Sequence, residues 1–336
     1  MTLKIMSFIG GIKLYDLQVK INNLKNNINV VIDNLKSKLT SRGISYPQES
    51  TLRYLISLIP LRIFTPINLY ASLSGHTAVN IDNSNIIFCG GSSIRTQKLY
   101  NTNSNTFINK QDYPNTTIRE HGGAKWDNVI YYTGGTSATN KTYAYNIQSN
   151  TFITKVDMPV HRSYHTFVAT NRFLLMSGGY HSGDIASQYT YDTPSNTYVS
   201  KINLKQATDH LSTAHIRDDQ VLINGGNDSH NSKLNYIYNI ASNAITSKRD
   251  LTVSRAYHKS LSIDSNNVLI LGGNVTTSNT TQIFSVSGNA FTSKKASPIT
   301  WSNHTLSIVR SDFLLSGGGN TKQYVYNYQR DTYVTS

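Results

Sequence analysis

Apolar residues in the larger, C-terminal part of the chain come in short runs, and each run ends in a pair of glycines. The run 86–89 (Ile-Ile-Phe-Cys) precedes Gly90, and five similar runs follow it. The first glycines of the six pairs are Gly90, Gly134, Gly178, Gly225, Gly272 and Gly317, which are 44, 44, 47, 47 and 45 residues apart. A nearly constant period of this length is typical of a protein built from repeated supersecondary units.

Three other positions recur in the same order within each period. A histidine precedes each glycine pair by 13 to 15 residues, an aromatic residue follows the pair, and a second apolar residue comes seven positions later. The histidines are His76, His121, His165, His210, His258 and His304; the aromatic residues are Tyr100, Tyr145, Tyr191, Tyr238, Phe284 and Tyr326; the second apolar residues are Phe107, Phe152, Tyr198, Ile245, Phe291 and Tyr333. Asn, Ser, Asp and Pro between the last two sets predict a tight turn. Each period therefore predicts four short antiparallel strands, the first beginning at the histidine.

These units predict an all-β domain of six blades over residues 73–336. One four-stranded sheet cannot bury both of its faces alone, whereas sheets stacked radially bury them against each other, which gives a β-propeller. The glycine pair suits this packing, because a backbone without Cβ bends sharply and lets a neighbouring ring approach.

The repeat resembles the kelch repeat, whose pattern is a diglycine closing the second strand, a Tyr-Asp-like pair, and a Trp six or seven residues later. The resemblance covers residues 73–336. Two departures mark a divergent member: Phe, Tyr or Ile replaces the Trp, and the units are shorter than the ~50 residues usual for the family. The resemblance implies a kelch-like propeller whose partners bind the face around the central channel.

Residues 1–42 show a different period and predict an α-helical coiled coil that oligomerises. Apolar residues alternate at spacings of three and four, which is an a/d heptad pattern. The predicted seam consists of Leu14, Leu17, Ile21, Leu24, Ile28, Val31 and Leu35. Ile at a and Leu at d suit a dimer, and Val31 at the last d position weakens that preference. Gly43 is expected to end the helix.

Residues 43–72 predict a short helical junction and linker. The stretch 39–59 resembles a segment common in tail and fibre proteins of bacteriophages: a helix, a turn with glycine, a Ser/Thr-rich stretch and a short Leu-x-x-Leu-Ile helix. Pro60 ends that helix and Pro66 keeps the linker extended. A coiled coil, a small junction and one globular head suit a projecting appendage, and the resemblance to tail fibres implies a homotrimer.

The basic charge is spread along the chain. Lys and Arg outnumber Asp and Glu by 31 to 18, with 9 basic and 3 acidic residues up to position 74 and 22 and 15 beyond it. Such a field favours polyanionic partners, although a basic solvated surface explains it equally simply. No motif of an RNA- or DNA-binding module is present, so we expect no nucleic-acid partner.

Neither a disulfide nor membrane insertion is expected. Cys89 is the only cysteine and lies within an apolar strand, so it should be a buried apolar residue. The apolar stretch 5–9 is too short for a signal peptide, and no stretch reaches the ~20 apolar residues of a membrane span.

The sequence predicts a binding protein and not an enzyme, with no catalytic residue, metal or cofactor. Histidines that recur once per blade point to a structural role, each holding its blade by a hydrogen bond to a neighbouring loop. Metal ligands so placed would lie too far apart around the channel. A glycosidase needs two carboxylates ~5–10 Å apart, and the acidic candidates are few: Glu120, Asp184, Asp209 and Asp228.

One face of the propeller is expected to bind a receptor. In a four-stranded meander, the loop entering strand one and the loop joining strands two and three lie on the same side. The residues expected there are Arg119, His121, Arg162, Tyr164, His165, His210, Arg255, Tyr257, His258, Trp301 and His304. Arg, Tyr, His and Trp around a concave surface suit sugars or phosphate-bearing polymers. Trp301 fits either sugar stacking or a place in the core.

These features together favour a phage, or phage-like, tail appendage. It would be made in the host cytoplasm and carried on the virion tail. There it would join other tail or baseplate proteins and bind a surface glycan or anionic wall polymer during host attachment. Two other classes stay open: an intracellular kelch adaptor that binds a protein, and a carbohydrate-active enzyme.

Overall fold

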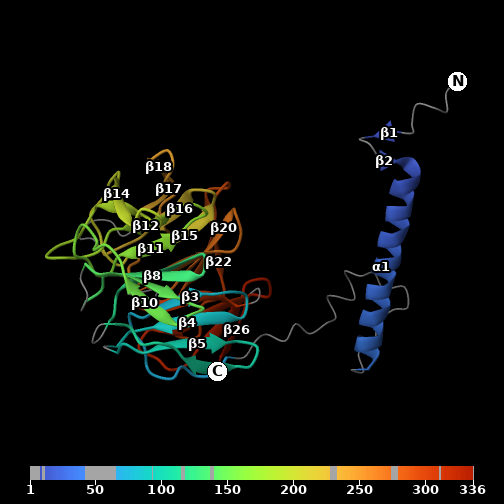
Figure 1. Cartoon of the computed structure of the whole chain (residues 1–336), viewed down its shortest axis with the longest axis horizontal. Coiled ribbons are helices and arrows are strands. Elements are labelled where there is room, and N and C mark those ends of the chain that lie inside the picture. Colours follow the sequence, from blue (N-terminus) through green and yellow to red (C-terminus); the bar gives the residue numbers. More distant parts are fainter. Residues whose placement is uncertain are drawn as a thin grey trace. The chain divides into compact units, whose positions relative to one another are not determined.

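The chain forms two compact units, Met1–Arg62 and Ile63–Ser336 (Figure 1). The structure, a computed structural model, describes residues 8–9, 12–41, 66–92, 94–114, 118–136, 140–227, 233–273, 279–309 and 312–335. For residues up to 25 it describes the backbone only.

The first unit contains one helix, α1 (Leu14–Thr40), after a small hairpin of β1 (Phe8–Ile9) and β2 (Ile12–Lys13). The structure thus contains one helix in the region of the predicted coiled coil, which does not by itself show a coiled coil, and the helix ends before Gly43. Ile28 and Val31 of the predicted seam are 39% and 47% exposed. Val30, which is not part of that seam, is 59% exposed. The side chains of Leu14, Leu17, Ile21 and Leu24, and the predicted junction up to residue 65, lie outside the described residues. Among described residues, no helix is long and apolar enough to span a membrane.

The second unit is a six-bladed β-propeller made of four-stranded antiparallel sheets. The first three blades are β3 (Thr77–Asn80), β4 (Asn85–Cys89), β5 (Gln97–Asn101) and β6 (Thr106–Asn109); β7 (Gly122–Trp126), β8 (Val129–Thr133), β9 (Thr142–Asn146) and β10 (Thr151–Thr154); and β11 (Thr166–Ala169), β12 (Leu174–Ser177), β13 (Gln188–Asp192) and β14 (Thr197–Lys201).

The other three blades follow in the same order. They are β15 (Ser212–Arg217), β16 (Gln220–Asn224), β17 (Asn235–Asn239) and β18 (Ala244–Ser247); β19 (Lys259–Ser262), β20 (Asn267–Leu271), β21 (Thr281–Ser285) and β22 (Ala290–Lys294); and β23 (His304–Val309), β24 (Asp312–Gly317), β25 (Tyr324–Asn327) and β26 (Thr332–Thr335). The predicted strand pattern is confirmed in every blade.

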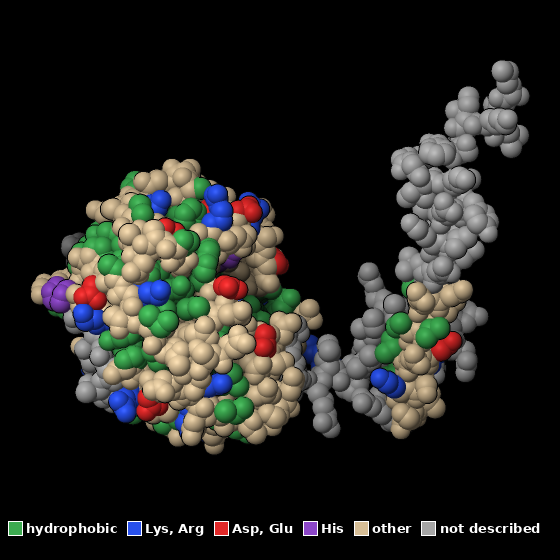
Figure 2. Space-filling model, in the orientation of Figure 1, with side chains coloured by type: hydrophobic (Ala, Val, Ile, Leu, Met, Phe, Trp, Pro, Cys, Tyr) green, Lys and Arg blue, Asp and Glu red, His purple; other side chains and the backbone are tan. Residues whose placement is uncertain are grey.

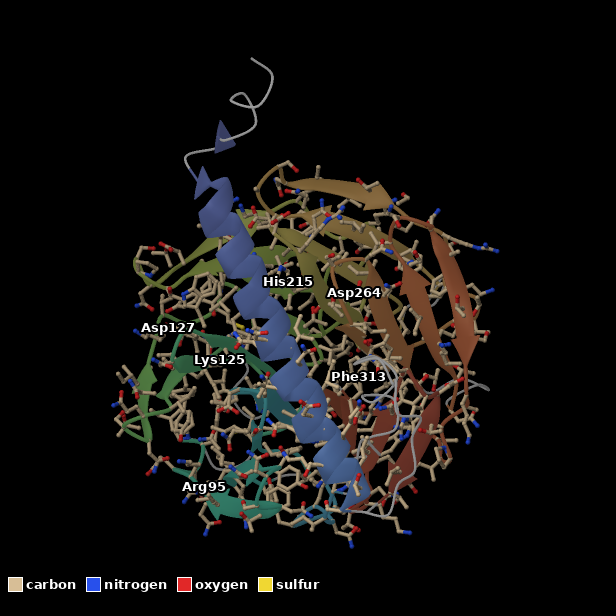
Figure 3. The ribbon with its side chains drawn as sticks, turned by 90° about the vertical axis from the view of Figure 1, so that its right-hand side faces the viewer. Arg95, Lys125, Asp127, His215, Asp264 and Phe313 are labelled. Atoms are coloured by element: carbon tan, nitrogen blue, oxygen red, sulfur yellow. The ribbon has the colours of Figure 1, made fainter. Side chains whose placement is uncertain are left out.

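The first strand of each blade lines a central channel. First strands of neighbouring blades contact each other around the whole ring, including β23 with β3. Figure 3 looks along the propeller: Lys125, His215, Asp264 and Phe313, from the inner strands and turns of four blades, surround its middle, whereas Arg95 lies toward the rim. The channel face is therefore assembled from short segments far apart in the sequence.

The recurring aromatic residues form the predicted outer hairpins. Tyr145 pairs directly with Phe152 across β9 and β10, with ring centroids 4.9 Å apart. The Tyr145 hydroxyl donates a 2.8 Å hydrogen bond to Asn150 Oδ1, and Asn150 has a left-handed φ of 58°. Asn tolerates this conformation better than most residues, so the Asn-rich turn and the tyrosine stabilise each other.

Residues 66–75 close the ring. Leu69 N–H donates to Thr321 O at 2.7 Å and Gly319 N–H to Leu73 O at 2.8 Å, while both leucines are buried between the first and last blades. Blade six forms its outer strand β26 from its own repeat. In the other five blades, the outer strand is followed by a segment that leads into the next blade. Residues 66–75 take the place of this segment between blade six and blade one. The expected domain boundary at residue 73 lies too late, because Leu69 already belongs to the propeller core.

The glycine pairs and the histidines are coupled across blade boundaries. The first glycine of most pairs lies directly against the imidazole Cε1 of the next histidine, as Gly134 does against His165. His165 Nε2 lies 2.9 Å from Thr133 Oγ1, and His258 Nε2 lies 2.7 Å from Asn224 Oδ1. The structural interpretation of these histidines is confirmed, although their partners are residues on strands of the preceding blade, not loops.

Candidate binding site at the channel mouth

Three of the expected receptor-binding residues, Arg162, Arg255 and Trp301, are instead core residues. They are 0%, 0% and 1% exposed. All three occupy the same repeat position, where the backbone carbonyl accepts a hydrogen bond from the second glycine of the preceding blade: Gly135 N–H to Arg162 O is 3.0 Å and Gly273 N–H to Trp301 O is 2.7 Å. Because this bond draws the position between two blades, the expectation that these side chains contact a receptor is wrong.

The buried polar groups of these residues are used inside the propeller. The Arg162 guanidinium donates to Gly178 O at 2.8 Å and Ser187 O at 3.1 Å. Arg255 makes the equivalent bond to Gly272 O at 3.0 Å. Burial lowers the pKa of both arginines to about 10. Trp301 Nε1–H donates to a serine hydroxyl, Ser297 Oγ, at 2.6 Å.

Four of the expected histidines lie behind the surface. His121, His165, His258 and His304 are 6%, 7%, 0% and 1% exposed. Burial lowers the pKa of His121 to about 3 and those of the other three well below the usual range, so all four are neutral at pH 7. They hold blades together, and His121, His165 and His304 also line the inner wall of the entrance cavity.

One residue per blade, one or two positions before the first strand, adopts a left-handed backbone, and together these residues form what we call the mouth ring. The mouth ring consists of Gly75, Glu120, Tyr164, His210, Tyr257 and Asn303, with φ values of 68°, 57°, 55°, 50°, 60° and 52°. Backbone N–H groups donate around the ring to carbonyls of the preceding member: Glu120 to Gly75 at 2.7 Å, Tyr164 to Glu120 at 2.9 Å and His210 to Tyr164 at 3.0 Å. The hydrogen bonds fix the backbone from which the side chains project at the channel entrance.

His210 differs from the other recurring histidines. In blade four, Leu211 takes the histidine position, because it is Leu211 that packs against Gly178. His210 therefore stands one residue earlier, in the mouth ring. Its place in the histidine series is a one-residue misalignment of the repeat, and His210 lines the entrance cavity.

Aromatic rings form one wall of the mouth. His210 stacks between two half-buried tyrosines, with ring centroids 4.0 Å from Tyr164 and 3.6 Å from Tyr257. Its Nδ1 lies 2.8 Å from Asp209 Oδ1. The row of three rings comes from three successive blades and presents both tyrosines at the entrance.

Two charged groups face the entrance without hydrogen-bonding partners. Lys259 is the first residue of β19, where the other blades have Thr, Gly or Ser. Burial raises the pKa of Glu120 and lowers that of Lys259, and their opposite charges partly offset both shifts. Among described residues, neither the Glu120 carboxylate nor the Lys259 ammonium makes a hydrogen bond or an ion pair. Ionisable groups in a cleft whose pKa values are shifted in this way mark a candidate functional site.

The space at the mouth is small and continues into the channel. The entrance cavity is about 50 Å³ and the adjoining channel cavity about 160 Å³, and Lys259 lines both. These volumes are below the range usual for drug-sized ligands, roughly 300–1,000 Å³. The mouth therefore suits a small polar group, such as the terminal residue of a longer chain, and not an extended polymer.

The structure brings together some predicted residues and adds others. Tyr164, His210 and Tyr257 meet at the mouth, with the exposed Arg119 beside them. Glu120, which we considered only as a catalytic acid, lies at the mouth as well. Lys259 and Asn303 were not predicted. Both directly flank a recurring histidine, so a comparison of the residues beside each histidine could have found them.

Comparison with known proteins identifies the fold. No family model and no curated protein matches the sequence. The solved structure of YjhT is similar, with a TM-score of 0.70 and 10% sequence identity over 81% of this chain and 99% of that chain. It is one of 1106 similar chains of solved structure. The chain thus contains a six-bladed β-propeller, a class whose members share architecture and not function.

Proposed function

We propose that this protein is a phage, or phage-like, tail appendage whose kelch-like propeller binds a bacterial surface glycan at the channel mouth. One observation carries the proposal: Tyr164 and Tyr257 flank an entrance that holds the unpartnered Glu120 and Lys259 groups. Aromatic faces pack against the apolar faces of sugars, and a few convergent polar groups fix the ligand's orientation. The terminal sugar of a surface glycan has both properties.

The charges at the mouth favour a glycan over an anionic wall polymer. Glu120 and Asp209 offset Lys259 and Arg119, so the entrance carries no strong positive field. Figure 2 shows Lys and Arg side chains scattered singly over one face of the propeller and interleaved with Asp and Glu. A polyanion binds best to a continuous basic surface, and a phosphate entering the mouth would meet the Glu120 carboxylate.

The helix of the first unit supports the tail-appendage part of the proposal. Apolar Ile28, Val30 and Val31 on α1 are exposed, which suits packing against helices of other copies in a coiled coil. We propose a homotrimer that projects from the tail and joins other tail or baseplate proteins through this unit. The kelch relationship is also a proposal, because the glycine pair and the aromatic residue after it recur in the kelch order.

A carbohydrate-active enzyme is the second candidate, because burial raises the pKa of Glu120 as a general acid requires. Asp209 would have to act as the second carboxylate, and it is 4% exposed and lies against His210. Release of reducing sugar from envelope glycans would favour this candidate over the binding protein.

Adsorption of the full-length protein to purified bacterial envelopes tests the proposal. We expect binding to envelopes of some bacteria, competed by soluble saccharides of that envelope. Glu120→Gln and Tyr164→Ala should each reduce adsorption at least tenfold. Tyr180→Ala, which removes a 45% exposed tyrosine outside the mouth, should leave it unchanged. Failure to bind any envelope, combined with tight binding to one cytosolic protein, would refute the proposal and favour an adaptor.

A further inference from the structure

A second cavity lies between blades two and three, at the other end of the inner strands. Its volume is about 350 Å³, and Trp126, Arg172, Phe173, Asp192, Val199 and Lys201 are among the residues that line it. Trp126 ends β7, whereas the mouth lies where the first strands begin. The turn after Trp126 is marked by Asp127 in Figure 3, away from the middle of the propeller. We propose that this cavity, which we call the blade groove, binds an uncharged sugar ring independently of the mouth.

The two aromatic walls of the blade groove break the six-fold repeat. Trp126 pairs with Val129 at the end of β7, a position held by Ile81, Thr170, Ile263 and Val309 in four other blades. Phe173 directly precedes β12, at a repeat position where the other blades have Asn, Val, Gln, Asn and Asp. Those four blades have aliphatic residues or threonine at the first position, and the other blades, except for Val129, have polar residues at the second. The propeller therefore packs without an aromatic ring at either position in its other blades.

The groove is held in place before any ligand arrives. Phe173 N–H donates to Thr170 Oγ1 at 3.1 Å, and Thr170 N–H donates to Phe173 O at 2.8 Å. Arg172 and Lys201 lie over the Phe173 ring, 5.4 and 5.6 Å from its centroid. Arg172 is itself fixed by two hydrogen bonds to the carboxylate of Asp219, one of them 3.1 Å long. A preformed wall of this kind spares a ligand the cost of ordering it.

The charges in the groove favour an uncharged ligand. The Asp219 carboxylate neutralises Arg172, and the remaining charged groups that line the groove are one cation, Lys201, and one anion, Asp192. The cavity has the size expected of a small-molecule site. Trp126, Phe173 and the 48% exposed Val199 supply apolar surface, while Lys201 and Asp192 supply a hydrogen-bond donor and acceptor. A pyranose, with one apolar C–H face and a rim of hydroxyls, matches this combination.

Tryptophan fluorescence gives a direct test on the full-length protein. Trp126 and Trp301 are the only tryptophans, and Trp301 is 1% exposed, so quenching by acrylamide reports mainly on Trp126. The probes are the methyl glycosides of glucose, galactose, mannose and N-acetylglucosamine. We expect at least one to change Trp126 emission in a saturable way and to protect it from quenching.

Matched variants locate the ligand. Lys201→Ala should weaken saccharide binding at least fivefold, whereas Lys155→Ala, at the same repeat position in blade two but outside the groove, should leave it unchanged. Tyr164→Ala at the mouth should also leave Trp126 titrations unchanged. Thermal unfolding of each variant shows whether the propeller stays folded, and a variant that unfolds is replaced by Lys201→Gln.

Three results would overturn the assignment: no glycoside affects Trp126, Lys201→Ala and Lys155→Ala have equal effects, or glucose 6-phosphate binds more than tenfold tighter than methyl glucoside. The inference does not depend on the phage role. Saccharide binding at Trp126 without adsorption to any envelope would leave the groove in place and refute the proposed function. If adsorption depends on Tyr164 and no glycoside changes Trp126 emission, the proposed function stands and the groove assignment is refuted.

Discussion

Glu120 reaches the mouth because its neighbour in the ring has no side chain. A Cβ on Gly75 would overlap the Glu120 carboxylate, and Gly75 has a φ of 68° that disfavours other residues. The same left-handed backbone is adopted by Tyr164 and Tyr257, for which it is strained. Strain repeated at a channel entrance, and held by hydrogen bonds between blades, supports a role for these residues beyond packing.

The buried histidines predict that the propeller loses stability in mild acid. The pKa values of His76 and His121 are lowered to about 3 by burial, and those of His165, His258 and His304 are also lowered. An unfolded histidine titrates near 6.5. Below that pH the unfolded state therefore binds more protons than the folded state, so the free energy of unfolding falls as the pH falls. Each such histidine contributes a slope of about 1.4 kcal/mol per pH unit.

Urea unfolding between pH 7.5 and 5 measures this slope, and a free energy of unfolding that stays constant over that range would contradict the prediction. The ordinary pKa of aspartate is too low for carboxylates to dominate there. His165→Leu is the matched variant, because blade four already has a leucine, Leu211, against Gly178 at this position. It should reduce the dependence of the free energy of unfolding on pH by about 1.4 kcal/mol per pH unit, the contribution of one histidine.

At the scale of strands, a paired change explains why two of the second apolar positions of the repeat hold tyrosine. Gln188 at the start of β13 donates from its side chain to Ile202 O at 2.8 Å, after the outer strand of its own blade. Blade two has the shorter Thr142 at the equivalent position, and the hydroxyl of Tyr198 from blade three fills the space, 2.7 Å from Thr142 Oγ1. Thr281 and Tyr333 repeat the arrangement at 2.5 Å. Tyrosine thus takes the place of phenylalanine or isoleucine on the outer strand where the third strand of the preceding blade begins with threonine.

Tyr198→Phe should consequently lower the free energy of unfolding by about 1 kcal/mol, because it leaves the Thr142 hydroxyl unpaired in a dry interface. Thr142→Val combined with Tyr198→Phe should cost less than the sum of the single changes. Urea unfolding of the three variants measures the coupling. Additive effects would show that the two hydroxyls do not interact.

The sequence predicted strands better than side-chain positions, for physical reasons that the repeat makes visible. Gly90 and Tyr145 act locally, through a bend and a hairpin, so their spacing was sufficient to predict the elements. Arg162 and Trp301 were misplaced because a hydrogen bond from another blade decides their burial, and no local pattern carries that information. The mouth ring was missed as a set because its members share a backbone conformation and not a residue type.

At the scale of the molecule, ring closure predicts where the chain can be shortened. A protein of residues 66–336 should keep the thermal stability of the propeller, because Leu69 and Leu73 remain between the first and last blades. Removing residues 66–75 as well should abolish cooperative unfolding, since it exposes that core and deletes the hydrogen bonds to Thr321 and Gly319. Circular dichroism melts compare the two. Equal melting of both proteins would show that the segment is not part of the closure.

The small mouth implies weak binding by one propeller, and this gives α1 a purpose in the proposed appendage. Linking several weak sites raises apparent affinity by about 10²–10⁴ when all can engage one surface. Ile28→Asp with Val31→Asp places charges among the exposed apolar residues of α1, so it should convert the proposed trimer into monomers. Adsorption to an envelope should then fall by at least a hundredfold, while binding of a soluble monosaccharide to one propeller stays unchanged. Light scattering gives the mass, and a native protein that is already monomeric at micromolar concentration would remove the avidity argument.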